Sequence, residues 1–253
     1  MEKKYFCLSI IIFGMILSVN TFAQTIKIPD LNFKKQLVVQ GIDLNGDGEI
    51  QLTEAKKVTR LSVDKADISS LVGIKNFTNL KELSFWNNQV KVLDLEGMKS
   101  LEEIFGYNNQ IQSINLKGMT NLRTLHIHQN KISALDLTGM QRLEEIKMHN
   151  NAMNKITISN LPKLVYIEFQ KNMLSEFKVT GCPAVKLIRL DDNQLSKLDF
   201  REFIDLEELS LRDNPLVELD IYGLRKLKQL DCSYTRLSNV NMSGTVSLSK
   251  MEW

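Results

Sequence analysis

The sequence predicts a solenoid of stacked repeats, each contributing a short β-strand, preceded by a small helical cap. An apolar residue recurs every 21 residues, from Leu80 and Leu101 to Leu248. Next to each one, apolar and polar residues alternate with a period of two, as in a strand with one buried face. Such a strict period indicates one structural unit stacked many times, and argues against a globule with a central pocket.

The chain begins with a segment that has the features of a secretory signal. Lys3 and Lys4 precede an apolar run that extends over residues 6–17, and small residues then lead to an expected cleavage site after Ala23. The run is too short to cross a bilayer comfortably, which favours cleavage over an uncleaved membrane anchor. We therefore expect a secreted or periplasmic protein with no later membrane span. The predicted parts are a signal peptide (1–23), a helical cap (24–57) and a repeat array (58–253).

The composition excludes several functional classes. Among 253 residues, 43% are hydrophobic and 25% charged, as in ordinary folded domains, and the net charge of +2 gives no electrostatic case for nucleic acid. Beyond residue 23, only Cys182 and Cys232 remain, three repeats apart. At ~4.8 Å per stacked strand they cannot form a disulfide, so both are expected to be buried thiols. We find no phosphate-binding loop or catalytic triad, and an open sheet does not exclude water, so we expect no enzyme activity.

Each repeat carries an asparagine where the chain leaves the strand. An inward polar side chain is costly unless its hydrogen bonds are satisfied. The carboxamide offers two donors and an acceptor, which can bond backbone groups of its own repeat and of the neighbouring repeat. We interpret this column as structural. Its members are Asn88, Asn109, Asn130, Asn151, Asn172, Asn193 and Asn214.

The repeated pattern L-x-x-L-x-L-x-x-N-x-L-x-x-L-x-L resembles the leucine-rich repeat family in its short bacterial form. The resemblance extends from Val58 to Trp253, with about nine repeats and a partial tenth. It implies a mostly β, right-handed solenoid with a parallel sheet on its concave side. The short connection between strands leaves no room for a full helix, so we expect short 3₁₀ or extended segments on the convex side. The segment ISSLVGIKNFTNL, residues 68–80, looks like the opening repeat of internalin-type proteins.

The segment DLNGDGEIQLTE, residues 43–54, matches the EF-hand calcium loop at every specified position. Helices are expected on both sides, one opening at Pro29-Asp30 and one over residues 53–59. The alternative interpretation is an aspartate- and glycine-rich turn without metal. A single loop favours a structural calcium in the cap over a cooperative sensor, and an EF-hand-like cap resembles an arrangement of secreted bacterial repeat proteins. The expected ligands are Asp43, Asn45, Asp47, the backbone carbonyl of Glu49, and Glu54.

The outward positions of the strands place aromatic residues and all three histidines on the early repeats. His128 and His149 are expected ~4.8 Å apart, with His126 about 7 Å away. A zinc site is one alternative, but we see no Asp, Glu or Cys on the nearest outward positions, and Lys147 would repel a cation. A merely solvated surface is the other. The expected ligand-binding patch comprises Trp86, Phe105, Tyr107, His126, His128, His149 and Tyr166.

These features predict a binding module that recognises a protein, or alternatively a glycan, on its concave face. Resemblance to internalin-type proteins implies adhesion or contact with a cell surface. The second hypothesis is an envelope component that self-associates through the incomplete tenth repeat, where Leu248, Met251 and Trp253 leave apolar surface and a strand edge. The sequence leaves the ligand and the oligomeric state open.

Overall fold

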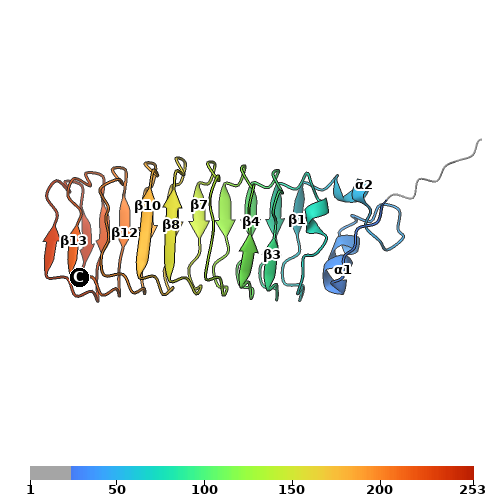
Figure 1. Cartoon of the computed structure of the whole chain (residues 1–253), viewed down its shortest axis with the longest axis horizontal. Helices are drawn as coiled ribbons and strands as arrows, with labels where there is room; N and C mark the ends of the chain where they lie inside the picture. The colour runs from blue at the N-terminus through green and yellow to red at the C-terminus, as the bar shows by residue number, and fades with distance from the viewer. Residues whose placement is uncertain (1–23) are drawn as a thin grey trace, which may run out of the picture.

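The computed structural model describes residues 24–253, and the predicted signal peptide lies outside them. The described chain is a curved stack of repeats with a helical cap at its N-terminal end (Figure 1). None of the helices in this part of the chain is long and apolar enough to cross a membrane.

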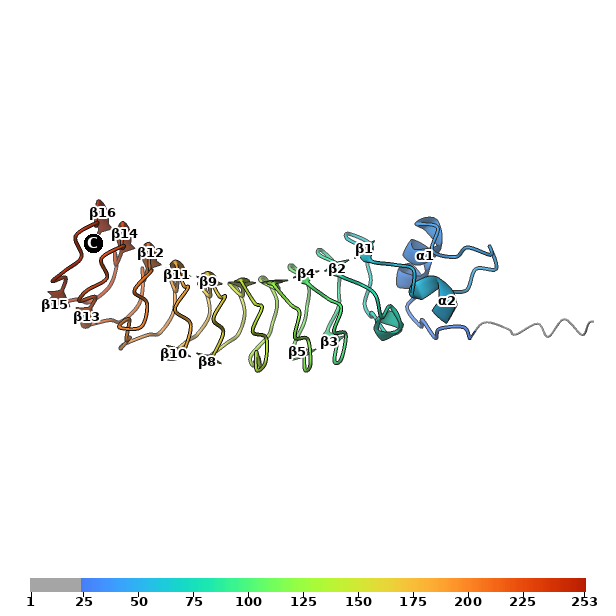
Figure 2. The same cartoon turned by 90° about the horizontal axis from the view of Figure 1, so that it is seen from above.

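One parallel sheet of ten strands runs the length of the stack and lines the inner side of its curve, as Figure 2 shows. Strands pair in the predicted register, with Leu83 opposite Ile104 and Ile104 opposite Leu125. The first step is one residue longer, because Leu61 pairs with Leu83. The strands are β1 (Arg60–Ser62), β2 (Glu82–Ser84), β4 (Glu103–Phe105), β6 (Thr124–His126), β7 (Glu145–Lys147), β9 (Tyr166–Glu168), β11 (Leu187–Arg189), β12 (Glu208–Ser210), β14 (Gln229–Asp231) and β16 (Lys250–Glu252).

The convex side is mostly extended, as the short connections predicted. A single 3₁₀ helix, η1 (Ile74–Asn76), occurs in the described chain, in the opening repeat. Elsewhere short strands pair across neighbouring repeats into three small parallel sheets. These strands are β3 (Val92–Asp94) with β5 (Ser113–Asn115), β8 (Lys155–Ser159) with β10 (Glu176–Thr180), and β13 (Glu218–Asp220) with β15 (Asn239–Asn241).

The core is one continuous column of apolar side chains between these two surfaces. At one position a large residue packs against a small residue of the next repeat. Phe85 is fully buried and fills the space beside Gly106 of the following repeat. A Cβ atom on Gly106 would lie 2.3 Å from Phe85 Cζ, so only glycine fits there. Cys182 and Cys232 are buried and free, as predicted.

The asparagine column is structural, as its chemistry predicted. Asn109 Oδ1 accepts a hydrogen bond from Val90 N at 3.0 Å, and Asn109 Nδ2 donates to Phe85 O at 3.0 Å and Gly106 O at 3.3 Å. The other asparagines repeat this arrangement, so each one joins its own turn to the preceding repeat. Where the column ends, Thr235 Oγ1 donates only to Cys232 O, within its own repeat.

One carboxylate bonds both the cap helix and the first repeat. Asp30 is the N-cap of α1 (Leu31–Val39), where its Oδ1 accepts from Phe33 N at 2.9 Å. Its Oδ2 accepts from the backbone nitrogens of Ser69 at 2.8 Å and Ser70 at 3.0 Å. Because Phe33 and Leu37 are fully buried, the helix closes the apolar end of the stack.

The second helix of the cap is shorter than predicted. The sequence favoured a helix over residues 53–59, but α2 spans Leu52–Ala55. The backbone then tightens into i to i+3 bonds, Lys57 N to Glu54 O and Val58 N to Ala55 O, as the chain turns towards β1. Residues 24–26 pair with the start of α2, since Leu52 N donates to Gln24 O at 2.9 Å.

Candidate functional site

Four planar side chains form a continuous stack across the early repeats of the concave face. They are Trp86, Tyr107, His128 and His149, which we call the ring ladder. Ring centroids are 5.4 Å apart for Trp86 and Tyr107, 4.7 Å for Tyr107 and His128, and 4.1 Å for the two histidines. Interplanar angles of 7°, 6° and 21° show that the rings stack face to face. The prediction that His128 and His149 lie next to each other is confirmed.

The backbone explains why these rings stack. Each ladder residue follows its strand by two positions and precedes a residue in the left-handed region, such as Asn87 (φ 55°) or Asn108 (φ 53°). Identical turns in a parallel sheet place equivalent side chains one strand spacing apart, ~4.8 Å, which is close to ring stacking distance. Lys65 continues the column, because its Nζ lies 4.5 Å from the centroid of the Trp86 ring.

Of the three other residues of the predicted patch, Phe105 and His126 adjoin the ring ladder, whereas Tyr166 does not. Phe105 and His126 lie on adjacent strands and meet edge to face, with centroids 5.2 Å apart. The His126 ring is 6.4 Å from that of His128. Tyr166 on β9 is 44% exposed and takes part in no ring contact among the described residues. The predicted patch is therefore a compact group of six side chains with Tyr166 apart from it.

The three histidines are held in their neutral form. Burial lowers the pKa of His128 from the ordinary 6.5 to about 4, and the nearby His149 and His126 add to this shift. Burial is also the main cause that lowers the pKa of His126 and of His149. At neutral pH each imidazole therefore carries one N–H donor and one acceptor nitrogen.

The structure does not assemble a zinc site around these histidines. Across residues 24–253, the predicted calcium loop included, there is no group of three or more His, Cys, Asp or Glu side chains arranged to hold a metal ion. The expectation that no acidic residue approaches them was wrong in one respect. Glu145 Oε1 lies 3.1 Å from His126 Nε2, but the same oxygen is 2.7 Å from Lys147 Nζ. This lysine neutralises the carboxylate that would otherwise attract a cation.

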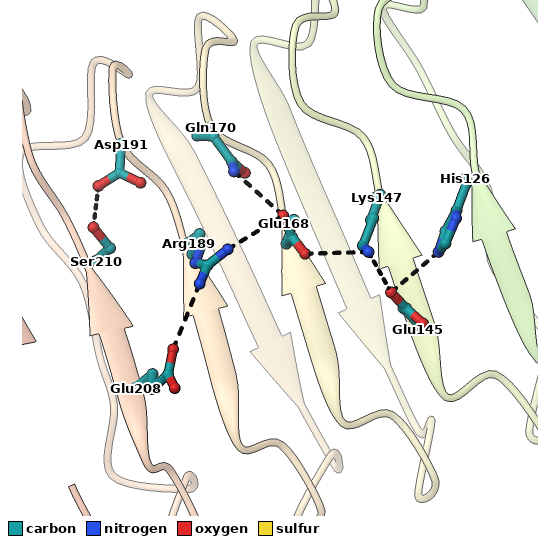
Figure 3. Close-up of polar contacts among 9 residues, drawn as sticks. All are labelled: His126, Glu145, Lys147, Glu168, Gln170, Arg189, Asp191, Glu208 and Ser210. Atoms are coloured by element: carbon teal, nitrogen blue, oxygen red, sulfur yellow. Dashed lines mark hydrogen bonds and ion pairs between the residues drawn. The ribbon is translucent and has the colours of Figure 1, made fainter. Parts of the chain in front are cut away.

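Beyond the rings, the concave face carries a chain of alternating charges, which Figure 3 shows. We call Glu145, Lys147, Glu168, Arg189 and Glu208 the ion-pair ladder. Lys147 Nζ lies 3.7 Å from Glu168 Oε1, and the Arg189 guanidinium reaches Glu168 at 3.8 Å and Glu208 at 3.6 Å. Sequence reasoning missed this network, although alternating signs at outward positions of successive repeats were a readable signal.

A partly buried carboxylate lies beside the ion-pair ladder. Asp191 Oδ1 accepts hydrogen bonds from Ser210 Oγ and, at 3.1 Å, from Arg212 N. Burial raises the pKa of Asp191 despite these bonds, and the negative charge of Asp231 adds to the shift. Removal from water therefore raises the pKa of this acid, as it lowers that of the histidines.

The entry side of the predicted calcium loop is a tight turn around one carboxylate. Asp43 Oδ1 accepts from Gly46 N and Asp43 Oδ2 from Gly48 N, both at 2.8 Å. Gly48 adopts a φ of 77°, the left-handed conformation that the motif reserves for glycine. Asn45 Nδ2 donates to Asp47 Oδ2 at 2.9 Å, so the three predicted ligands of this side gather in one loop.

The exit side places a buried carboxylate against the same loop. Glu54 is only 5% exposed, and its two oxygens accept from Leu44 N and Gln51 N at 2.8 Å each. No ion pair within residues 24–253 involves Glu54. The side chain of Glu49 instead pairs with Lys34, which leaves its backbone carbonyl for the predicted role. The loop thus offers oxygen ligands alone, the type that calcium prefers.

Comparison with known proteins agrees with this architecture. Residues 28–151 match the family model of the leucine-rich repeat domain of the endo-beta-N-acetylglucosaminidase EndoS. A search of curated protein sequences finds no match.

Solved structures share the fold at low sequence identity. The functional domain of InlJ from Listeria monocytogenes aligns with a TM-score of 0.58 and 19% identity, covering 91% of this chain and 61% of that one. YopM from Yersinia enterocolitica aligns with a TM-score of 0.57 and 22% identity, covering 78% and 46%. A chain of the LRIM1/APL1C complex gives a TM-score of 0.66 and 19% identity, covering 76% and 38%. The chain thus spans less than two thirds of each of these proteins.

Three findings agree on the fold. The strands recur with the predicted register, the asparagine column joins successive turns, and residues 28–151 match the model of a leucine-rich repeat domain. The chain therefore has the leucine-rich repeat fold.

Proposed function

We propose that this protein is a secreted or periplasmic binding module that recognises a protein partner on its concave face. Leucine-rich repeat solenoids typically serve as binding scaffolds, because stacked repeats create an extended concave surface without a closed reaction site. The observation that carries the proposal is the stacked ring ladder beside Phe105 and His126. The signal-like segment supports export, and the internalin-like repeats support a role at a cell surface.

The ring ladder has the properties of an interface anchor. Aromatic side chains are enriched among the residues that dominate binding energy. Stacking also restricts the rings before any partner arrives, so little side-chain entropy remains to be lost on binding. The ion-pair ladder lacks this advantage, because its charges already satisfy one another. We therefore assign the main recognition surface to the early repeats.

Affinity capture tests this assignment. The mature chain is immobilised and exposed to proteins from the envelope and medium of the source cells. A triple alanine variant at Trp86, Tyr107 and His128 should lose a specifically captured protein by at least about tenfold, as expected for hot-spot residues. The matched control is Arg212→Ala with Ser233→Ala, at equivalent positions of later repeats. Equal capture by the ring variant, with its fold verified by circular dichroism, would contradict the proposal.

We further propose that the cap binds a structural calcium ion through the loop of residues 43–54. The donor set supports this, since Asp43, Asn45 and Asp47 gather in one turn beside the buried carboxylate of Glu54. Their oxygens accept backbone hydrogen bonds but keep further lone pairs for a cation. A bound ion would fix the loop between the two cap helices and so hold the cap on the first repeat.

Thermal melting in calcium and in chelator tests the metal. With an affinity of ~10⁻⁴–10⁻³ M, as in extracellular modules, about 1 mM calcium should stabilise the cap by roughly 0.4–1.4 kcal/mol and raise its melting midpoint. Glu54→Gln should abolish that rise. Glu49→Gln is the control, because only the backbone carbonyl of Glu49 is an expected ligand. An identical midpoint with and without calcium in the unmodified protein would refute the site.

Self-association is a second candidate function. β16 pairs with β14 and with no other described strand, while Val246 is 80% exposed and Trp253 63% exposed. Such an edge is a template for another chain. Size-exclusion chromatography over a range of concentrations, with and without Trp253, distinguishes the two functions. A dimer that is lost on truncation would favour self-association. A monomer at all concentrations would favour the binding module.

A further inference from the structure

The ring ladder presents mainly ring edges to solvent, because every ring face except the outer face of His149 is covered. Tyr107 has Trp86 on one face and His128 on the other, with interplanar angles of 7° and 6°. His149 covers the far face of His128, and Lys65 lies over the outer face of Trp86. A ligand that approaches the concave face therefore meets ring edges.

Covered faces argue against a stacked sugar. A pyranose binds an aromatic residue by laying its C–H groups against the electron-rich ring face. In the ladder this place is taken by the neighbouring ring, at centroid distances of 4.1–5.4 Å. Ring edges carry the opposite, positive electrostatic potential. They favour ligand oxygens that carry negative charge or lone pairs.

The exposed edges also carry a row of hydrogen-bond donors. Nδ1 of His128 and Nδ1 of His149 are buried without a partner among the described residues. Because a buried unpaired N–H is rarer than a buried unpaired acceptor, the proton belongs on the outer Nε2. The indole N–H of Trp86 and the hydroxyl of Tyr107 donate to no group within residues 24–253 and are not among its buried unpaired atoms. Four donors thus recur at strand spacing, ~4.8 Å.

Unpaired cations flank the donor row at both ends. Lys65 lies over Trp86, and Lys171 directly follows Gln170, whose carbonyl accepts from Asn150 N, so Lys171 lies in the repeat next to His149. Both side chains are exposed, and neither takes part in an ion pair in the described chain. One acid, Asp64, lies at the Trp86 end, where its carboxylate already accepts from Trp86 N at 2.9 Å and from Ser84 Oγ at 2.7 Å. Glu82 and Glu103 begin their strands, four residues from the rings, about 13 Å towards the opposite border of the sheet.

We propose that the ring ladder binds an extended acidic segment of a protein partner, which lies across the strands and meets the ring edges through its carboxylate and carbonyl oxygens. This inference rests on the proposed binding function and specifies its ligand. Lys65 and Lys171 are five strand spacings apart, about 24 Å, which an extended peptide of about seven residues covers. The cations then hold the two ends of the segment, and the donor row holds its middle.

Selection from a phage-displayed library of random dodecapeptides tests the inference. The pool retained by the mature chain should be enriched in Asp and Glu, and a selected peptide should bind by fluorescence anisotropy. Its affinity should fall about tenfold in Lys65→Ala with Lys171→Ala, and about tenfold again when Tyr107→Ala opens the ladder. Trp86→Phe, which keeps the ring and loses the N–H, should have an intermediate effect. Lys99→Ala with Lys163→Ala is the charge control and should leave affinity unchanged.

Several outcomes would overturn the inference. They are a pool without acidic enrichment, no retained peptide at all, or affinity unaffected by the lysine and tyrosine variants. Binding of an acidic oligosaccharide such as oligogalacturonate, with tighter affinity than the peptides and the same variant dependence, would assign the surface to a glycan. If peptides bind but depend on Arg212→Ala rather than on Tyr107→Ala, the protein-binding function survives and the assignment to the ring ladder fails.

Discussion

The ring ladder and the ion-pair ladder lie next to each other on one sheet, yet adjacent repeats cohere there through different forces. In the first region, flat rings stack at 4.1–5.4 Å and remove one another from water. In the second region, acids and bases of adjacent repeats alternate at 3.6–3.8 Å and neutralise one another. The backbone register is the same in both regions, so the choice of side chain alone decides which force acts.

This difference bears on recognition. A charge in the ion-pair ladder must give up an existing partner before it binds a ligand, and exposed pairs of this kind contribute little energy in either case. The rings keep their stacking contacts while their edges remain available. In a solenoid, a single row of stacked rings can thus hold neighbouring repeats together through the ring faces and bind a ligand through the ring edges.

The largest expected effect comes from the scaffold that both regions share. Asn109→Ala beneath the ring ladder and Asn193→Ala beneath the ion-pair ladder each leave buried backbone groups without partners. We expect each to lower the free energy of unfolding by about 3 kcal/mol, measured by urea denaturation. Gln194→Ala, an exposed neighbour, is the control and should change it by less than about 0.5 kcal/mol. A loss confined to one region would show that the scaffold is not uniform.

Removal of one member from each ladder is expected to separate the two forces. Tyr107→Ala loses stacking on both sides, and should cost about 2 kcal/mol. Arg189→Ala breaks two contacts of 3.6 and 3.8 Å between partly exposed groups, and should cost about 0.5 kcal/mol. The same urea titration measures both. Equal losses would mean that the ion-pair ladder stabilises the fold as much as the ring ladder does, and would contradict the expected difference between them.

A fall in pH should change the free energy of unfolding in opposite directions through the two regions. The pKa of His128 is about 4 in the folded chain and 6.5 when unfolded, so the unfolded state binds more protons between these values. His128 therefore costs stability as the pH falls from about 6.5 to 4. The pKa of Asp191 is raised on folding, so the folded state binds more protons just above pH 3.8, and this group adds stability as the pH falls.

Matched variants isolate these two contributions. His128→Phe keeps a stacking ring without a titrating nitrogen, and should be less sensitive than the unmodified protein to a change from pH 7 to pH 5. Asp191→Asn keeps the acceptor of Ser210 without the charge, and should lose the opposing trend. Chemical denaturation between about pH 7 and pH 4 measures both, because the effect of Asp191 lies just above pH 3.8. A pH dependence of stability that is unchanged in His128→Phe would show that the histidine titrates normally in the fold.

Sequence reasoning predicted the parts of this molecule that the repeat itself determines. The period gave the register of the sheet, the column of asparagines and the rows in which Trp86, Tyr107 and the histidines lie. These features follow from backbone geometry that every repeat shares. A shift of the strand register by one residue would have placed all of these side chains on the opposite face of the sheet.

The missed contacts depend on how far individual side chains reach. Glu145 begins its strand, yet it meets His126 of the preceding repeat because both side chains lean along the strands. Lys65 covers Trp86 from a position that the pattern treats as part of a turn. Asp30 bonds residues 39 and 40 positions away, and nothing in the local sequence indicates those partners. Rotamers and long-range docking decide such contacts, and neither has a periodic signature.

Salt is expected to produce the smallest effect and to distinguish the two ladders most cleanly. At 1 M ionic strength the Debye length is about 3 Å, so contacts of 3.6–3.8 Å between partly exposed charges are largely screened. The cost of Arg189→Ala, already small, should then fall to a few tenths of a kcal/mol or less. The cost of Tyr107→Ala should persist, because stacking and burial do not depend on screening. Denaturation of both variants and the unmodified chain at low and high sodium chloride measures this difference. If high salt removed the cost of Tyr107→Ala instead, charge around the rings, rather than stacking, would hold the early repeats together.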